Sequence, residues 1–178
     1  MKAKPETKTV EQLLQLKMAN MLYANPEYQR GDVWTLAQKK RLIDSVFRGY
    51  PIPLIYLHHI SKELAGAKRE DFEVIDGQQR INSLYEYREG SFKTFDPVKD
   101  EEEARFPSFI KDTACPWGGK RFEDLAPDLQ EKILFLKWEA AEHCGICEQT
   151  IRRMSSLLLW TDQRARWAAL TSRICDRA

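Results

Sequence analysis

The sequence predicts an α+β (α/β mixed) domain, in which helices flank a small mixed sheet. Two segments near the N-terminus carry apolar residues at helical spacing behind a capping threonine. Two later segments, Leu54–Leu57 and Phe72–Ile75, are rich in β-branched or aromatic residues, as buried strands are. A glycine turn then leads from the second strand into a third helix. The chain of 178 residues is long enough to form one such domain around its own core.

The first two helices are predicted from their capping residues. In each, a threonine is followed three residues later by a glutamine, so the two side chains can bond each other's backbone N–H groups. The pairs are Thr9 with Gln12 and Thr35 with Gln38. The first helix should end near Ala19 and the second at Gly49, because glycine tolerates the conformation of a helix terminus. The residues before Thr9 are expected to be frayed.

The centre of the sheet is predicted from its prolines and apolar residues. Pro51 and Pro53 exclude a helix, so Leu54–Leu57 should be a central strand buried on both faces. This strand should form a hairpin with residues 72–76, across a charged connection from Ser61 to Glu70.

Three further elements are expected after the glycine turn. Gly90 should end the third helix, and Ser91–Phe95 has the alternation of a strand. A short helix should run from about Asp128 to Ile133, and Leu134–Trp138 should supply a final strand.

Polar and charged side chains that could bind a ligand are concentrated at the turn from Asp76 to Arg80, where a strand meets a helix. The first N–H groups of a helix lack intrahelical partners and lie at the positive end of its dipole, so they favour an anion. Gly77 would let a ligand approach the backbone, and Arg80 would add donors suited to phosphate. Gln78 and Gln79 can orient a phosphate, a sugar or a water molecule. Asp76 would repel phosphate unless Mg²⁺ or a proton lies between them, which indicates metal binding or general-base work.

A purely structural interpretation of this turn is also open. Asp76 would then cap the helix, Gly77 would make the turn, and Gln78 to Arg80 would form a solvated first turn. Arg80 is expected to be exposed, so its replacement should change stability little.

A second candidate region is the loop Tyr28–Trp34, which contains Gln29 and Arg30. An arginine in a loop is usually a surface charge or a member of an ion pair. The alternative is that Arg30 converges with Arg80 on a phosphate, which Gln29 would help to orient.

A local basic patch is expected on the second helix, formed by Lys39, Lys40 and Arg41. Such a run is usually the solvated side of a helix, and contact with a nucleic-acid backbone is the alternative. The net charge of +1 gives the whole chain no general attraction to nucleic acid, so any anion site must be local.

Three motifs stand in order along the chain: Tyr28–Trp34, Leu42–Pro53 and Asp76–Arg80. The pentapeptide Asp-Gly-Gln-Gln-Arg before an apolar helix resembles the signature of the GmrSD-type restriction endonuclease N-terminal domain family. The other two motifs resemble upstream segments of that family, and the second is similar to its "LIxSIxxGxPIP" segment. A later stretch, Phe122–Ile133, resembles the family's "FxxLxPxLxxKI". The resemblance implies a ParB/sulfiredoxin-like fold.

The resemblance also implies a function. It implies binding of a nucleoside triphosphate (NTP), with hydrolysis, in a modification-dependent restriction or phage-defence system. On this basis we expect a Mg²⁺-dependent NTPase in which Asp76 is the catalytic and metal-binding residue. Nucleotide and phosphate binding would fall to Gln29, Arg30, Gly77, Gln78, Gln79 and Arg80.

In GmrSD-type systems this domain is coupled to an HNH-type nuclease domain that cuts modified phage DNA. The three histidines of this chain lack the spacing of that nuclease, so the chain should lack the nuclease domain and should not cut DNA by itself. An alternative function is a non-catalytic ParB-like DNA-binding or adaptor module in which nucleotide acts as a switch. A third alternative is that the chain binds nothing, because a missing C-terminal part completes the pocket.

The resemblance divides the chain into two parts. Residues 1–141 are expected to form the GmrSD N-terminal-like domain. Residues 142–178 depart from the family, and we interpret them as the atypical tail of a truncated or frame-shifted product.

A metal site is a weaker hypothesis for the tail. His143, Cys144 and Cys147 have zinc-ligand character, but a single C-x-x-C needs Cys175 or Cys115 to complete four ligands. A thioredoxin-like redox pair is less favoured still, because that motif belongs to a different fold.

The chain is expected to be cytoplasmic, with no membrane partner. No apolar run approaches membrane-spanning length, and the N-terminus lacks the apolar core of a signal peptide. Its four cysteines are too few and too unevenly placed for a secreted disulfide framework.

Overall fold

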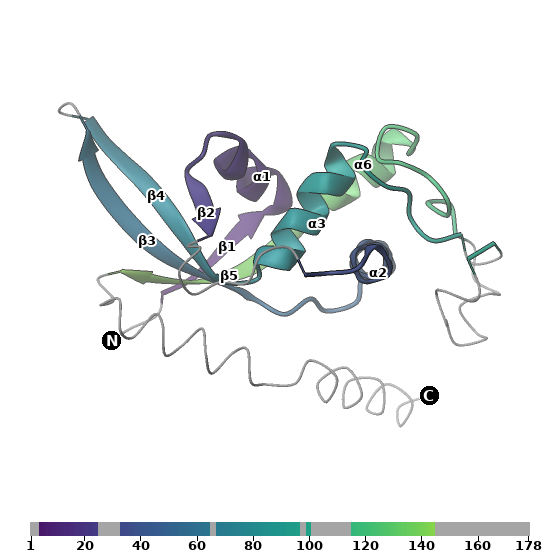
Figure 1. The fold of residues 1–178 in the computed structure, drawn as a ribbon, viewed down its shortest axis with the longest axis horizontal. Helices are drawn as coiled ribbons and strands as arrows, with labels where there is room; N and C mark the ends of the chain where they lie inside the picture. Colours follow the sequence, from purple (N-terminus) through teal and green to yellow (C-terminus); the bar gives the residue numbers. More distant parts are fainter. Residues whose placement is uncertain (1–3, 25–32, 65–66, 97–98, 101–114, 145–178) are drawn as a thin grey trace, which may run out of the picture.

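The fold is built on a five-stranded mixed sheet, and Figure 1 shows its strands on one side of the view, with α2, α3 and α6 on the other. The computed structural model describes residues 4–24, 33–64, 67–96, 99–100 and 115–144. The strands are β1 (Lys4–Thr9), β2 (Leu22–Ala24), β3 (Ile55–Leu64), β4 (Ala67–Asp76) and β5 (Lys137–Cys144), in the order β1-β5-β3-β4-β2. Neighbours β1 and β5 are antiparallel, as are β3 and β4, whereas β3 with β5 and β2 with β4 are parallel. The predicted α+β class and the central place of β3 are confirmed. Its predicted burial on both faces is wrong, because Tyr56 is only half-buried between the buried Ile55 and Leu57.

The helices of the described ranges are α1 (Val10–Met18), α2 (Leu36–Arg48), α3 (Gln78–Arg88) and α6 (Pro127–Leu134). Both predicted capping boxes are present, because Thr9 and Thr35 each exchange bonds with the glutamine three residues on. The second helix ends at Gly49, whose φ of 73° confirms the predicted left-handed terminus. Among the described residues, no helix combines the length and apolarity needed to cross a bilayer.

The core lies on one face of the sheet. Paired residues of neighbouring strands share a face, and Leu57 pairs with Val74 while Ile55 pairs with Ala140. All four side chains are buried. They belong to one cluster with apolar residues from all four described helices.

Residues Lys4–Thr9 form a strand, so the expectation of a frayed end is wrong for the described part of this segment. Strand β1 pairs with β5 from Lys4 opposite Glu142 to Thr9 opposite Lys137. Its order comes from a partner that is remote in sequence, which no local pattern reveals.

The β3–β4 hairpin is longer than predicted. Pairing continues to Leu64 and Ala67, so most of the charged connection expected at residues 61–70 is strand. Charges paired across the strands stabilise this extension, and Lys62 Nζ lies 3.0 Å from a carboxylate oxygen of Asp71. Figure 1 shows the hairpin extending away from α2, α3 and α6.

The prediction of a strand at Ser91–Phe95 is wrong. Thr94 N–H donates to the carbonyl of Lys120 at 3.0 Å, and the Thr94 hydroxyl donates to the carbonyl of Trp117. The segment therefore bonds an irregular loop instead of the sheet. Ser91 and Lys93 are exposed while Phe92, Thr94 and Phe95 are buried, so the alternation in sequence reflects burial in a loop and not pairing in a sheet.

The last two described elements are confirmed with shifted bounds. Helix α6 begins at Pro127, and the final strand begins at Lys137 instead of Leu134 and runs to Cys144. The expected domain boundary at residue 141 lies within this strand. Residues 145–178, which include two of the proposed zinc ligands, Cys147 and Cys175, lie outside the described residues. Among the residues that the structure does describe, no group of three or more His, Cys, Asp or Glu side chains could hold a metal ion.

Candidate functional site

The turn between β4 and α3, Asp76–Arg80, is where the sequence predicts an anion-binding site, and we call this turn the corner. Gly77 is the N-cap of α3, and its carbonyl accepts the first helical bond from Ile81 N–H at 3.0 Å. Within the described part of the chain, no side chain caps this helix. The interpretation in which Asp76 caps α3 is therefore wrong. The N–H groups of the first turn have no helical partner and favour an anion.

Gly77 is required here by backbone conformation and by packing. Its φ of 102° is left-handed, which residues with a Cβ rarely adopt. A Cβ on Gly77 would also lie 2.6 Å from Cγ2 of Ile55, so the turn packs directly on the central strand β3. These constraints explain the glycine without a ligand, and its role in ligand clearance stays a prediction.

Arg80 is buried at this corner, with 7% of its surface exposed. Its Nη1 donates to the carbonyls of Pro53 at 2.5 Å and Leu54 at 3.2 Å, and its Nη2 donates to Oδ2 of Asp76 at 2.5 Å. Burial lowers the pKa of the guanidinium, and the charge of Asp76 opposes this shift. The expectation of an exposed Arg80 is wrong, because its side chain is buried where it can donate hydrogen bonds to the two carbonyls ahead of β3.

Asp76 is held in place but not enclosed. Arg80 fixes one of its oxygens, while 34% of the Asp76 side chain is exposed. A carboxylate has about four lone-pair sites, so this bond leaves acceptor capacity at the surface. The arrangement can present a fixed carboxylate to a cation or to a water molecule.

The two glutamines of the turn have different surroundings. Oε1 of Gln79 accepts bonds from the N–H groups of Val33 at 3.2 Å and Trp34 at 3.3 Å, just ahead of α2. The half-buried Gln78 makes no side-chain hydrogen bond to any described residue. Of the two, Gln78 is therefore better placed to meet a ligand.

These hydrogen bonds bring the three sequence motifs together. Val33 and Trp34 end the first motif and Pro53 ends the second, and both ends bond to the third motif at Asp76–Arg80. Sequence reasoning missed the carbonyl of Pro53 as a member of the site. Pro53 could have been noticed, because the second motif ends there, but the proline only indicated that a helix is excluded.

Two predicted site residues, Gln29 and Arg30, lie outside the described residues. The predicted convergence of Arg30 with Arg80 on one anion therefore stays a prediction.

The basic patch expected on α2 is largely neutralised inside the protein. Lys39 is buried, and its Nζ lies 2.9 Å from Glu86 on α3. Lys40 Nζ lies 3.6 Å from Asp100 and 5.2 Å from the ring centre of Phe95. Neither solvation nor contact with nucleic acid accounts for these two lysines.

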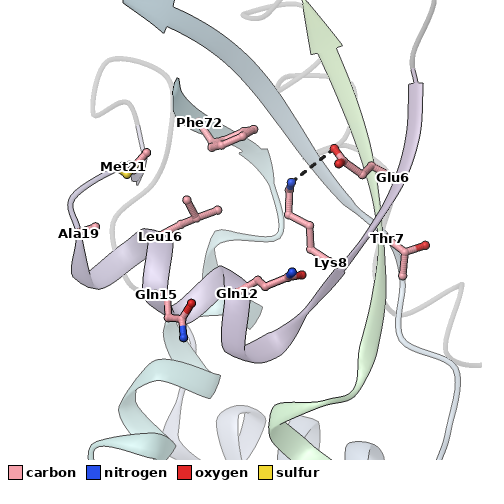
Figure 2. Close-up of a pocket in the computed structure, with 9 residues that line it drawn as sticks. All are labelled: Glu6, Thr7, Lys8, Gln12, Gln15, Leu16, Ala19, Met21 and Phe72. Atoms are coloured by element: carbon pink, nitrogen blue, oxygen red, sulfur yellow. Dashed lines mark hydrogen bonds and ion pairs between the residues drawn. The ribbon is translucent and has the colours of Figure 1, made fainter. Parts of the chain in front are cut away.

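A groove of about 410 Å³ lies elsewhere, between β1 and α1 (Figure 2). Most of its polar side chains already bond within the protein. Lys8 pairs with Glu6 at 3.4 Å, the Gln12 side chain accepts from the Thr9 N–H in the capping box of α1, and Gln15 donates to Glu11 at 3.0 Å. No residue of the Asp76–Arg80 turn lines it. We therefore place the candidate site at the corner, where groups able to meet a ligand are concentrated, and not in the groove.

Replacing Arg80 with lysine should destabilise the domain. Lysine keeps the charge but lacks the planar fork that reaches two carbonyls and a carboxylate together, so we expect Arg80→Lys to lower the free energy of unfolding by about 2–3 kcal/mol. The exposed Arg88→Lys is the matched control and should change it by less than about 0.5 kcal/mol. Urea denaturation of both variants measures the difference, and equal small effects would show that the burial of Arg80 carries no energetic weight.

Replacing Gly77 with alanine should also destabilise the domain, by more than the same change at Gly90. Both glycines have positive φ, at 102° and 72°, but a Cβ at Gly90 would meet nothing within 4 Å. Gly90→Ala should therefore report backbone strain alone, at about 1 kcal/mol, while Gly77→Ala adds about 1–3 kcal/mol from its contact with Ile55. Equal midpoints in chemical denaturation would contradict the packing of this turn on β3.

Comparison with known protein families identifies the chain. The family model described as "GmrSD restriction endonuclease, N-terminal domain" matches residues 10–158, a span that contains all three motifs and continues beyond residue 141. No curated protein and no solved structure matches the chain, so the ParB/sulfiredoxin-like detail stays a prediction. The match covers most of the sequence, and the chain therefore belongs to the family of GmrSD restriction endonuclease N-terminal domains.

Proposed function

We propose that this domain binds a nucleoside triphosphate with Mg²⁺ at the corner between β4 and α3, and hydrolyses it as part of a restriction or phage-defence system. Membership of the GmrSD family associates the chain with restriction endonucleases. The turn between β4 and α3 supports an anion site. That the anion is a nucleoside triphosphate, and that it is hydrolysed, is what the resemblance to the family implies.

One observation carries the proposal. Three motifs that are separate in the sequence are joined by hydrogen bonds at a single helix N-terminus, through Gln79 to the first motif and through Arg80 to the second. A structural turn needs only the glycine and its packing partner. The joining of three motifs around amides that lack helical partners fits a site for an anionic ligand better.

The phosphate contacts follow from the positions of the donors. The backbone N–H groups from Gly77 onwards and the side-chain amide of Gln78 would donate to phosphate oxygens. Arg80 would contribute positive charge from its buried position under the turn. Gln29 and Arg30 would complete the set.

Asp76 would act on the metal or on water. Its carboxylate is fixed by Arg80 and still part-exposed, so it could hold Mg²⁺ against the phosphates or orient the attacking water. Mg²⁺ would also offset the repulsion between the carboxylate and the phosphates. Without such a cation, the same carboxylate would weaken anion binding.

The proposed partners follow from the family. We propose that nucleotide turnover here is coupled to an HNH-type nuclease domain or subunit acting on modified DNA. Two of the three basic residues that were expected to contact nucleic acid through α2, Lys39 and Lys40, are paired internally, which disfavours DNA binding by this helix.

The proposal predicts that Asp76→Asn separates binding from turnover. Asparagine keeps an acceptor for Arg80, so the domain should fold, but it loses the charge that holds Mg²⁺ or activates water. We expect calorimetry with ATP, GTP, CTP and UTP, each with Mg²⁺, to find binding of at least one nucleotide by both proteins. Phosphate release should fall by about 100-fold or more in the variant.

Asp71→Asn is the matched control for this experiment. Asp71 lies earlier on β4 and pairs with Arg69 at 2.7 Å, so its replacement should leave turnover unchanged. Binding without turnover in the unaltered protein would favour the non-catalytic module in which nucleotide is a switch. Binding of none of the four nucleotides would contradict the proposed function.

A further inference from the structure

We propose that Gln79 is a positioning residue, which holds the chain ahead of α2 against the first turn of α3 and so maintains the shape of the nucleotide site. This inference rests on the proposed function and deepens it. It replaces direct ligand contact, the role that the sequence predicts for Gln79, with an indirect one.

The geometry of Gln79 supports this role. A side-chain carbonyl oxygen has two lone pairs, and Oε1 of Gln79 accepts two N–H groups, those of Val33 and Trp34. This oxygen therefore has no lone pair left for Mg²⁺ or water. The backbone at Gln79 is fixed as well, because its carbonyl accepts a bond from the Ser83 hydroxyl at 2.6 Å.

The segment that Gln79 holds has little other support at its first residue. Val33 is 59% exposed, so burial of its side chain does not fix its position. Trp34 packs against the core, but its backbone N–H precedes α2 and has no helical acceptor. The two bonds that Gln79 accepts therefore fix the start of this segment against α3, while the Lys39–Glu86 pair joins α2 to α3 further along the helix.

Gln78 provides the contrast. Successive residues on a helix point about 100° apart, so the two glutamines cannot face the same neighbour. Gln79 faces the segment ahead of α2, whereas Gln78 makes no side-chain bond to a described residue. Variants at these two positions can thus separate positioning from ligand contact.

Amide hydrogen exchange on the full chain without nucleotide tests the contact directly. Gln79→Met keeps the side-chain length but removes the acceptor, so exchange at Val33 and Trp34 should accelerate on the order of tenfold. Gln79→Glu keeps an acceptor and should restore protection, and Gln78→Met should leave both amides as they are. Unchanged exchange in Gln79→Met would overturn the proposal.

Nucleotide affinity then separates positioning from direct contact. Val33→Pro removes one of the two donors without touching Gln79. If Gln79 acts through this segment, Gln79→Met and Val33→Pro should each weaken nucleotide binding by about threefold to tenfold. The double variant that carries both changes should then lose less affinity than the product of the two single losses. Losses that multiply in full would show direct contact and overturn the proposal. If the unaltered chain binds no nucleotide, the proposed function fails, while the exchange rates still decide whether Gln79 holds the segment.

Discussion

The buried guanidinium of Arg80 is the interaction on which the candidate site depends. Removing such a charge from water is costly unless hydrogen bonds replace its hydration. Here two carbonyls ahead of β3 and the carboxylate of Asp76 provide them. The same group therefore joins the start of the central strand, the end of β4 and the first turn of α3. A shift of any one of these segments would remove at least one partner from the buried charge.

This constraint explains how one carboxylate can be both fixed and accessible. Asp76 gains its orientation from a buried cation on one side, while part of its side chain faces solvent on the other. Gly77 contributes by letting the turn lie directly on Ile55, where any Cβ would intrude. The corner is thus set by packing and charge together, and Trp138 adds to it by donating to the same Pro53 carbonyl at 2.9 Å.

Features that depend on neighbours in sequence could be predicted, and features that depend on remote partners could not. The capping boxes at Thr9 and Thr35 and the helix end at Gly49 are local, and all three are confirmed. Strand β1 is ordered by β5, and the segment after α3 is ordered by Thr94 bonding a distant loop, so local patterns misjudged both. In the site, the turn and its glycine were predictable. The burial of Arg80 was not, because two of its three acceptors are backbone carbonyls, which carry no residue-specific signal.

The most direct test of this account is a titration of the ¹⁵N-labelled chain with a non-hydrolysable nucleoside triphosphate and Mg²⁺, followed by amide chemical shifts. The account predicts the largest shift changes at the backbone amides from Gly77 to Arg80, where the first turn of α3 meets the phosphates. Largest changes among Thr7 to Met21, around the groove between β1 and α1, would contradict it, as would a spectrum that does not change.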